Sequence, residues 1–369
     1  MHLFYIILFL EVFLAVVFFV VSPSSKTNNK TVEQPLQSNY KESVYLILSF
    51  GILFFFHAFR DPYSLVDIPE YADAYKEAFK TPWSLVLSEH FYSLKSEVGF
   101  RIVIKGLSCL FPSYQMLFVI TSGFLIYSFF RATKKYSVFC WMSVLLFLVN
   151  SFAESLFILR AFICIGILLF SFPYIIERKI LPFLLLNLLA MSIHISSVVF
   201  LPVYFLYGIN NIKLLCGTFV VSSLFILLWF NSIITYVVEQ FLPGYSYYFI
   251  FMDNYEGASW KMPALLGFLL IWRIMVLKQS FFENGIVRLF SILSIMAFVI
   301  YTAGMGFGLT SRMAMFFTNM TFLILPDTVS RMRNRSLSIF ISILYIVFVG
   351  YFFLRNSSES LWINYRLIS

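Results

Sequence analysis

The stretch SLFILRAFICIGILLFSFPYII, residues 155–176, decides the fold. Its single charged side chain is Arg160, and every other position is apolar or uncharged. A helix of this length reaches about 33 Å, enough to cross a hydrocarbon core of about 30 Å. The stretch therefore predicts a transmembrane helix that carries a buried arginine.

Similar apolar stretches recur along the chain, which has 369 residues, 60% of them hydrophobic and 12% charged. Soluble domains are about 25% charged, and a chain of this size cannot bury so much apolar surface in water. We expect an all-α, polytopic integral membrane protein with about 11–13 transmembrane helices, forming a single membrane domain over residues 1–369. The predicted spans are about 3–22, 43–59, 114–130, 137–152, 155–176, 180–194, 196–209, 213–231, 262–278, 286–303, 311–325 and 337–354.

Basic residues lie in short clusters between the apolar stretches, although the net charge is +8. This placement is typical of cytoplasmic loops and does not favour binding to nucleic acid. Alternate loops carry the clusters, which places both termini and residues 60–97 on the external side. The four cysteines are far apart and form no CxxC motif, so neither a disulfide framework nor a metal site is expected.

The segment 97–111 differs from the spans. Glu97, Arg101 and Lys105 recur every four residues, so one face of a helix is charged. This pattern predicts an amphipathic or re-entrant helix that does not fully cross the bilayer.

Two long loops, 60–97 and 231–261, combine acidic and aromatic side chains on the predicted external side. The first holds seven of the 18 acidic residues, among them Asp61 and Asp67. Carboxylates accept hydrogen bonds from sugar hydroxyls, and aromatic rings cover the C–H faces of sugars. The alternative is an ordinary interfacial aromatic belt with solvated charges.

Neither Arg160 nor Arg312, in GMGFGLTSRMAMFF, belongs to a basic cluster. An arginine at membrane depth is costly and normally faces a polar cavity. Its planar fork binds phosphate, so two arginines at one external cavity would suit a lipid-linked diphosphate. The alternative is that Arg160 pairs with Glu154 and that Arg312 reaches the headgroups.

His194 lies in LLLNLLAMSIHISSVVFLP, between two spans. A single histidine among apolar residues is commonly a hydrogen-bonded packing residue. The alternative is a general base or a donor to substrate, because imidazole changes charge near neutral pH.

An ordered set of motifs spreads over residues 60–325: FRDPYSLVDIPEYADAYKEAF, SEVGFRIVIKGLSCLF, SLFILRAFICIGILLF, LLAMSIHISSVVFLPVYFL and SRMAMFF. In this order the chain resembles the EpsG-like, Wzy-type polymerases of bacterial surface polysaccharides such as O antigen. It departs from them at Asp67–Tyr71, where the family often has a glycine-bearing Asp-x-Tyr stretch.

The resemblance implies a fold similar to that of GT-C membrane glycosyltransferases. It also implies a multi-pass protein of the bacterial inner membrane that joins oligosaccharide repeat units, carried on undecaprenyl diphosphate, at the periplasmic face. Membrane lipid and a polysaccharide chain-length regulator are implied partners, and no cofactor or metal is expected.

Glycosyl transfer then assigns roles as hypotheses. Positive charge must stabilise the leaving diphosphate, a base must take the acceptor's proton, and aromatic rings must hold the sugars. The candidates are Arg160, Arg312 and Arg60 for the diphosphate; His194, Asp61, Asp67 and Glu97 for the base, unranked; and Tyr71, Tyr75 and Tyr255 for the sugars.

Three other functions remain open. An O-antigen ligase would use the same donor with a different acceptor. A flippase or other transporter should show repeat symmetry and charges along a continuous path, which this chain lacks. A membrane acyltransferase would need an acidic partner for His194, and none is adjacent in sequence.

Overall fold

The computed structural model describes residues 2–20, 40–65, 68–86, 96–241, 260–283, 285–303, 308–357 and 366–367. Within these ranges the regular elements are helices, and the β-structure consists of one isolated bridge between Arg60 and Leu367. Four helices are long and apolar enough to cross a membrane: Tyr40–Ala58, Gln115–Tyr136, Lys261–Phe282 and Ile286–Ala303. The structure confirms an all-α membrane protein.

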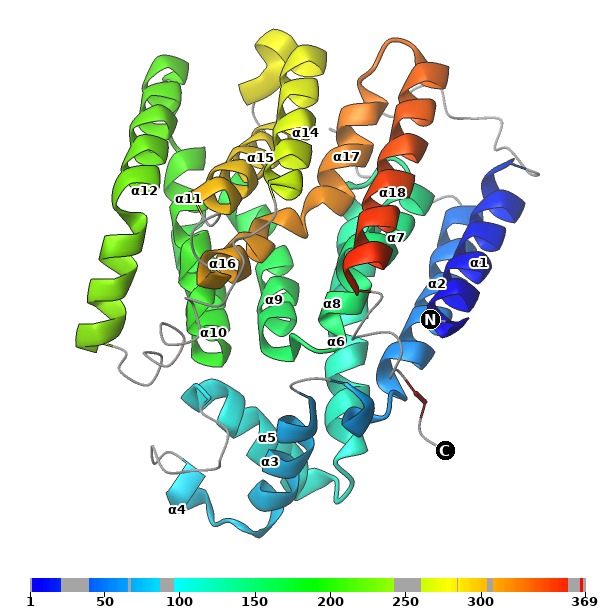
Figure 1. Cartoon of the computed structure of the whole chain (residues 1–369), viewed down its shortest axis with the longest axis vertical. Coiled ribbons are helices and arrows are strands. Elements are labelled where there is room, and N and C mark those ends of the chain that lie inside the picture. The colour runs from blue at the N-terminus through cyan, green and yellow to red at the C-terminus, as the bar shows by residue number, and fades with distance from the viewer. Residues whose placement is uncertain are drawn as a thin grey trace. The chain divides into compact units, whose positions relative to one another are not determined.

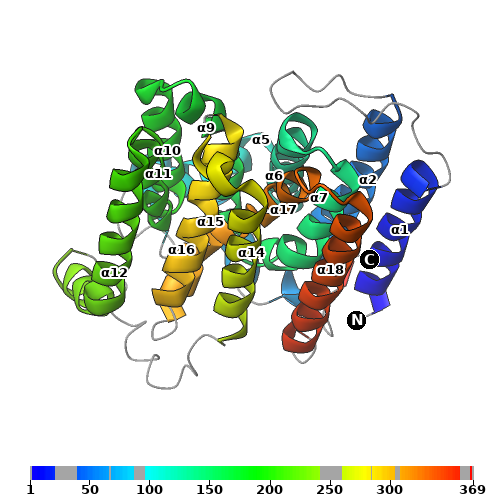
Figure 2. The same ribbon diagram turned by 90° about the horizontal axis from the view of Figure 1, so that it is seen from above.

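The helices, which Figures 1 and 2 draw, belong to two compact units. The first unit comprises Met1–Phe170, Leu188–Ile195 and Leu325–Ser369, and the second comprises Ser171–Asn187 and Ser196–Ile324. Each unit contains two of the four membrane-capable helices. The prediction of a single membrane domain therefore stays a prediction.

The first unit is built from apolar helices and a smaller amphipathic group. Its helices are α1 (His2–Ala15), continued by the π-helix η1 (Val16–Val20), α2 (Tyr40–Ala58), η2 (Pro62–Ser64), α3 (Ile68–Lys80), α4 (Trp83–Val86), α5 (Val98–Leu110), α6 (Gln115–Tyr136), α7 (Cys140–Phe147), the π-helix η3 (Leu148–Phe152), α8 (Ala153–Ser155) and α18 (Arg335–Ser357).

The second unit contains η4 (Ile195–Phe200) from its second residue onward, α11 (Leu201–Tyr207), α12 (Ile212–Phe241), α14 (Lys261–Leu277), η7 (Lys278–Phe282), α15 (Ile286–Ala303) and α16 (Gly308–Thr318). The boundaries between the units fall inside α9 (Leu159–Ile176), α10 (Ile180–Ile193) and α17 (Thr321–Ser330). Stacked phenylalanines form part of the core of the second unit: Phe200 packs on Phe317 with ring centroids 5.7 Å apart.

The helices follow the predicted spans closely, because in lipid each backbone group must be hydrogen-bonded within its own helix. Three predictions were wrong in their boundaries. Helix α12 continues to Phe241, so the beginning of the predicted loop 231–261 is helical. Helix α6 continues to Tyr136, and the predicted span 311–325 is divided between α16 and α17. The first predicted loop, 60–97, contains helices as well, namely α3 and α4. The predicted amphipathic segment 97–111 corresponds to α5.

Helix α5 is too short to cross a bilayer, since 13 residues reach only about 20 Å. It packs against α3 at one end of α2 and α6 within the first unit (Figure 1). The Tyr75 hydroxyl donates to the Phe111 carbonyl at 2.7 Å, and Lys105 Nζ donates to the Ala78 carbonyl at 2.9 Å. Of the predicted charged face of α5, Lys105 therefore contacts α3, at the negative end of the α3 dipole.

Gly99 brings the first turn of α5 directly against the last turn of α10. A Cβ atom at Gly99 would lie 2.3 Å from Ser192 Oγ and 2.5 Å from the Ser192 carbonyl oxygen. Such an approach requires glycine, because a backbone atom cannot move aside as a flexible side chain can. This contact places the residue that precedes α5, Glu97, next to the chain that leaves α10.

Candidate functional site

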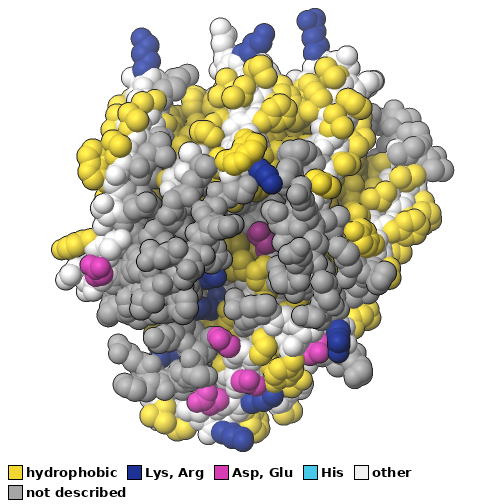
Figure 3. Space-filling model, in the orientation of Figure 1, with side chains coloured by type: hydrophobic (Ala, Val, Ile, Leu, Met, Phe, Trp, Pro, Cys, Tyr) yellow, Lys and Arg dark blue, Asp and Glu magenta, His cyan; other side chains and the backbone are white. Residues whose placement is uncertain are grey.

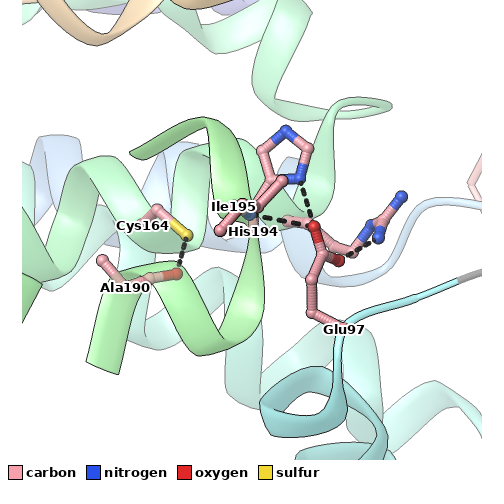
Figure 4. A network of polar contacts seen from close by, with 6 residues as sticks. Glu97, Cys164, Ala190, His194 and Ile195 are labelled. Carbon is pink, nitrogen blue, oxygen red and sulfur yellow. Dashed lines mark hydrogen bonds and ion pairs between the residues drawn. The ribbon is translucent and has the colours of Figure 1, made fainter. Parts of the chain in front are cut away.

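Glu97 is the centre of a polar network in the first unit (Figure 4). Its Oε2 accepts a hydrogen bond from Arg160 Nη1 at 2.5 Å, and the two side chains form an ion pair through this contact. Its Oε1 lies 3.2 Å from His194 Nδ1 and accepts from the Ile195 backbone N–H at 2.9 Å. Three segments that are distant in sequence thus meet at one carboxylate, and we call Glu97, Arg160 and His194 the Glu97 cluster.

Helix α9 presents Arg160 to this carboxylate from its first turn. Arg160 and Cys164 are four residues apart and so lie on one face of the helix. The Cys164 thiol donates to the Ala190 carbonyl at 3.1 Å, which joins this face of α9 to α10 (Figure 4). The guanidinium also lies 6.0 Å from the ring centroid of Phe100 on α5. Arg160 of α9 is therefore held against the beginning of α5.

His194 lies where α10 ends and η4 begins. An ionised carboxylate has no proton to donate, so the hydrogen bond to Glu97 requires the proton to be on Nδ1. In the neutral ring, Nε2 is then unprotonated, and Figure 4 shows that nitrogen pointing away from Glu97. The carboxylate thus selects the tautomer in which Nε2 accepts a proton.

The charges of the cluster favour the ionised form of Glu97. Burial by itself would raise the pKa of this carboxyl group. The hydrogen bond from His194, the positive charge of Arg160 and the Ile195 N–H outweigh burial and lower the pKa to about 2. All three side chains keep 15–16% of their surface exposed, so the cluster is accessible from outside the protein.

Arg60, the third predicted diphosphate ligand, belongs to a separate polar group. Its side chain is fully buried, and Nη1 lies 3.0 Å from His57 Nδ1 and 3.3 Å from Ser122 Oγ. His57 also lies 2.6 Å from Ser122 Oγ and 3.0 Å from Ser155 Oγ. These contacts join α2, α6 and α8, and the role of Arg60 toward substrate stays a prediction.

Three further predicted residues have identified contacts. Asp61 caps η2 by accepting from the Tyr63 N–H at 3.0 Å. Tyr71 packs edge-on against Phe100, and Tyr75 hydrogen-bonds to α5, as described above. Both rings are buried, with 6% and 1% of their surface exposed, so their contacts are those of packing residues. Their sugar-binding role stays a prediction.

The remaining predicted site residues are Arg312, Asp67 and Tyr255. Arg312 is exposed on α16 of the second unit, and its convergence with Arg160 of the first unit stays a prediction. Asp67 and Tyr255 lie outside the described residues. Among the residues that the structure describes, no group of three or more His, Cys, Asp or Glu could hold a metal ion.

The cluster combines a cation that can bind phosphate with an imidazole whose basic nitrogen is oriented by a carboxylate. Sequence reasoning named all three residues but assigned Glu97 only as one of several bases, and considered Glu154 as the partner of Arg160. It overlooked Cys164 and His57. The spacing of Cys164 from Arg160, and a histidine in the last turn of an apolar helix, were the available signals.

The model of the EpsG family matches residues 43–367 of the chain. The match includes every residue of the Glu97 cluster and omits α1. Comparison with curated proteins and with solved structures gives no match.

Proposed function

Because the chain belongs to the EpsG family, we propose that it polymerises lipid-linked oligosaccharide repeat units into a surface polysaccharide. Family membership supports a polysaccharide polymerase-like membrane protein. The finer proposal is that the units are carried on undecaprenyl diphosphate, that the product is O antigen or a similar polysaccharide, and that the reaction takes place at the periplasmic face of the inner membrane.

The observation that carries the proposal is that Glu97 contacts both Arg160 and His194. In glycosyl transfer the bond between the anomeric carbon and the diphosphate oxygen breaks, and a bond from the acceptor hydroxyl oxygen to that carbon forms. The hydroxyl proton must be removed and the diphosphate charge must be stabilised. One cluster contains a group suited to each task.

His194 is the base in this proposal. Its Nε2 takes the proton of the acceptor hydroxyl as the new bond forms, and the imidazolium that results is stabilised by the Glu97 carboxylate at Nδ1. Asp61 is less suited, since its carboxylate already caps η2. Glu97 itself is a positioning residue, because its low pKa makes it a weak base.

Arg160 stabilises the leaving diphosphate. One guanidinium nitrogen, Nη1, is anchored by Glu97, and a planar guanidinium fork is suited to binding phosphate oxygens. Donors aimed at developing charge are each worth about 10²–10³-fold in rate. Arg312 would supply a second cation, as the sequence predicts.

The proposal also includes a chain-length regulator as partner and membrane lipid as surroundings. These follow from the family resemblance and from the apolar helices. No step of the reaction as written requires a metal or a cofactor.

The test uses a strain of the source bacterium that lacks this protein and is complemented with variants. We expect the deletion to remove the polysaccharide ladder and leave single repeat units, and Arg160→Ala and His194→Ala to do the same while inserting in the membrane at wild-type levels. The matched control is Arg131→Ala, which removes another guanidinium of the first unit, one that lies 4.4 Å from the Phe170 ring centroid.

The outcomes separate the alternatives. A normal ladder with both Arg160→Ala and His194→Ala would refute the assigned roles. Loss of even the single transferred unit in the deletion strain would point to a ligase or a flippase instead.

A further inference from the structure

A second polar and aromatic group lies on the first unit, outside the Glu97 cluster. It consists of Tyr63 in η2, Asp73 and Lys76 on α3, and Tyr114 at the beginning of α6, and we call it the Tyr63 cluster. The rings of Tyr63 and Tyr114 pack edge-to-face with centroids 6.4 Å apart. Figure 3 shows acidic and basic side chains gathered at the end of the molecule where Figure 1 places α3 and α5.

Hydrogen bonds fix the polar groups at the edge of the Tyr63 ring. The Tyr63 hydroxyl donates to Asp73 Oδ1 at 2.9 Å, and Lys76 Nζ lies 3.3 Å from the same oxygen. Lys76 Nζ also donates to the Tyr63 hydroxyl and lies 5.0 Å from the centroid of each tyrosine ring. The hydrogen bond to Tyr63 raises the pKa of Lys76, so the amine stays charged.

The exposed surface of its ring distinguishes Tyr63 from the two tyrosines that the sequence analysis assigned to sugar binding. Tyr63 has 49% of its surface exposed, whereas Tyr71 and Tyr75 have 6% and 1%. The side chains of Asp73 and Lys76 are 59% and 49% exposed, so the carboxylate and the amine are accessible beside the open ring. An exposed aromatic ring with an acceptor and a donor fixed at its edge is what a sugar requires.

The charges favour a sugar over an anionic lipid headgroup. Asp73 compensates Lys76, so the cluster has no net positive charge to attract a phosphate. Both polar side chains can instead bond neutral hydroxyls, Asp73 as an acceptor and Lys76 as a donor.

The Tyr63 cluster and the Glu97 cluster lie on opposite sides of α3. Tyr71 and Asp73 are two residues apart, which places them about 200° apart around the helix. Tyr71 faces Phe100, whose ring is also approached by Arg160, whereas Asp73 faces outward to Tyr63. The two clusters are therefore separated by α3 itself and by the packed rings of Tyr71 and Phe100.

We propose that the Tyr63 cluster is a subsite for a sugar residue of the polysaccharide chain, distinct from the reaction centre. The Tyr63 ring covers the C–H face of the sugar, and Asp73 and Lys76 bond its hydroxyls. This inference rests on the proposed function. It adds that the protein holds the polysaccharide chain at a second point, which keeps the growing polysaccharide near the Glu97 cluster between successive additions.

The experiment measures binding of lipid-free oligosaccharide to the purified full-length protein. The probe is one to three repeat units released from wild-type polysaccharide by mild acid, observed by saturation-transfer NMR and titration. We expect Tyr63→Ala to bind about 10-fold more weakly or worse, and Tyr63→Trp to retain binding. The matched control is Phe79→Ala, which removes an exposed aromatic ring, 55% exposed, from the same helix α3.

The same variants are then compared for polymer length in cells. We expect Tyr63→Ala and Asp73→Asn to make shorter chains while still forming the first linkage, and Arg160→Ala to bind the lipid-free probe as the wild type does. Unchanged probe binding in Tyr63→Ala would overturn the subsite and leave the proposed function standing.

Two other results separate the explanations. If Arg160→Ala and His194→Ala polymerised normally, the proposed function would fail independently of the probe result. If Tyr63→Ala instead lost binding to phosphatidylglycerol vesicles and kept binding the probe, the cluster would be a lipid contact and the proposal would be wrong.

Discussion

Glu97 and His194 are 97 residues apart in sequence, yet His194 Nδ1 lies 3.2 Å from Glu97 Oε1. The same carboxylate binds the backbone N–H that follows His194, so the histidine is fixed both by its ring and by its main chain. This arrangement makes the tautomer of His194 depend on the charge of Glu97.

The dependence can be tested with a double-mutant cycle. We expect His194→Gln to slow polymerisation by about 10²–10⁴-fold, the usual contribution of a general base, and Glu97→Gln to slow it less. If Glu97 acts through His194, the double variant should be no slower than His194→Gln alone. The measurement is the single-turnover rate of purified protein with lipid-linked repeat units, and fully multiplicative effects would contradict the coupling.

Arg160 should not tolerate lysine. Arg160→Lys keeps the positive charge but loses the fork that joins Glu97 to a phosphate at the same time. We expect it to retain the fold yet lose most of the rate, with a larger effect on kcat than on KM, because the diphosphate charge develops in the transition state. A rate within about 3-fold of the wild type would show that charge alone is sufficient.

Much of the fold could be predicted from the sequence, because each transmembrane helix is encoded locally. The predicted span 286–303 is α15, with the same boundaries. The four-residue spacing of Glu97, Arg101 and Lys105 predicted the helix α5. Helix α12 was predicted to end at about residue 231, whereas it continues to Phe241.

The residues of the site could be named, but their contacts could not. Arg160 and His194 stand out as polar groups in apolar surroundings, whereas the partner of Arg160 depends on how α5 packs against α10. That packing is set by Gly99 and Ser192, which give no signal in sequence. The sequence does not show which face of α3 meets α5, and the exposure of each tyrosine depends on that face. Tyr71 and Tyr75 were therefore favoured as sugar-binding residues although their rings are buried, and Tyr63 was not.

The close contact at Gly99 predicts a large effect from one methyl group. Gly99→Ala must move α5 away from Ser192 and so draw Glu97 away from His194 and Ile195. We expect lower polymerisation and a lower unfolding temperature. Gly106→Ala is the matched control: a Cβ there meets nothing within 4 Å, and alanine should stabilise the helix by about 0.5–1 kcal/mol.

A second substitution sharpens this test. Ser192→Gly removes two of the three atoms that the new Cβ would meet and leaves the carbonyl oxygen at 2.5 Å. The combination with Gly99→Ala should therefore recover part of the activity. Equal activity of Gly99→Ala and Gly106→Ala would show that the close approach does not position Glu97.

The low pKa of Glu97 predicts how stability changes in acid. The carboxyl group has a pKa of about 2 in the folded protein, against 4.5 as the ordinary value. A depressed pKa adds stability that is present above pH 4.5 and lost as the pH falls toward about 2. The shift corresponds to on the order of 3 kcal/mol. Glu97→Gln lacks this contribution at every pH.

We therefore expect the unfolding temperature of the wild type to exceed that of Glu97→Gln at about pH 5.5, and the two to converge as the pH is lowered below about 4. Unfolding is followed in detergent by the exposure of Cys164, a buried thiol of the same region. Glu77→Gln, which alters an exposed carboxylate on α3, controls for general effects of charge and should match the wild type throughout. A difference between wild type and Glu97→Gln that is as large at pH 3 as at pH 5.5 would mean that shape, rather than the ionised carboxylate, holds Arg160 and His194 in place.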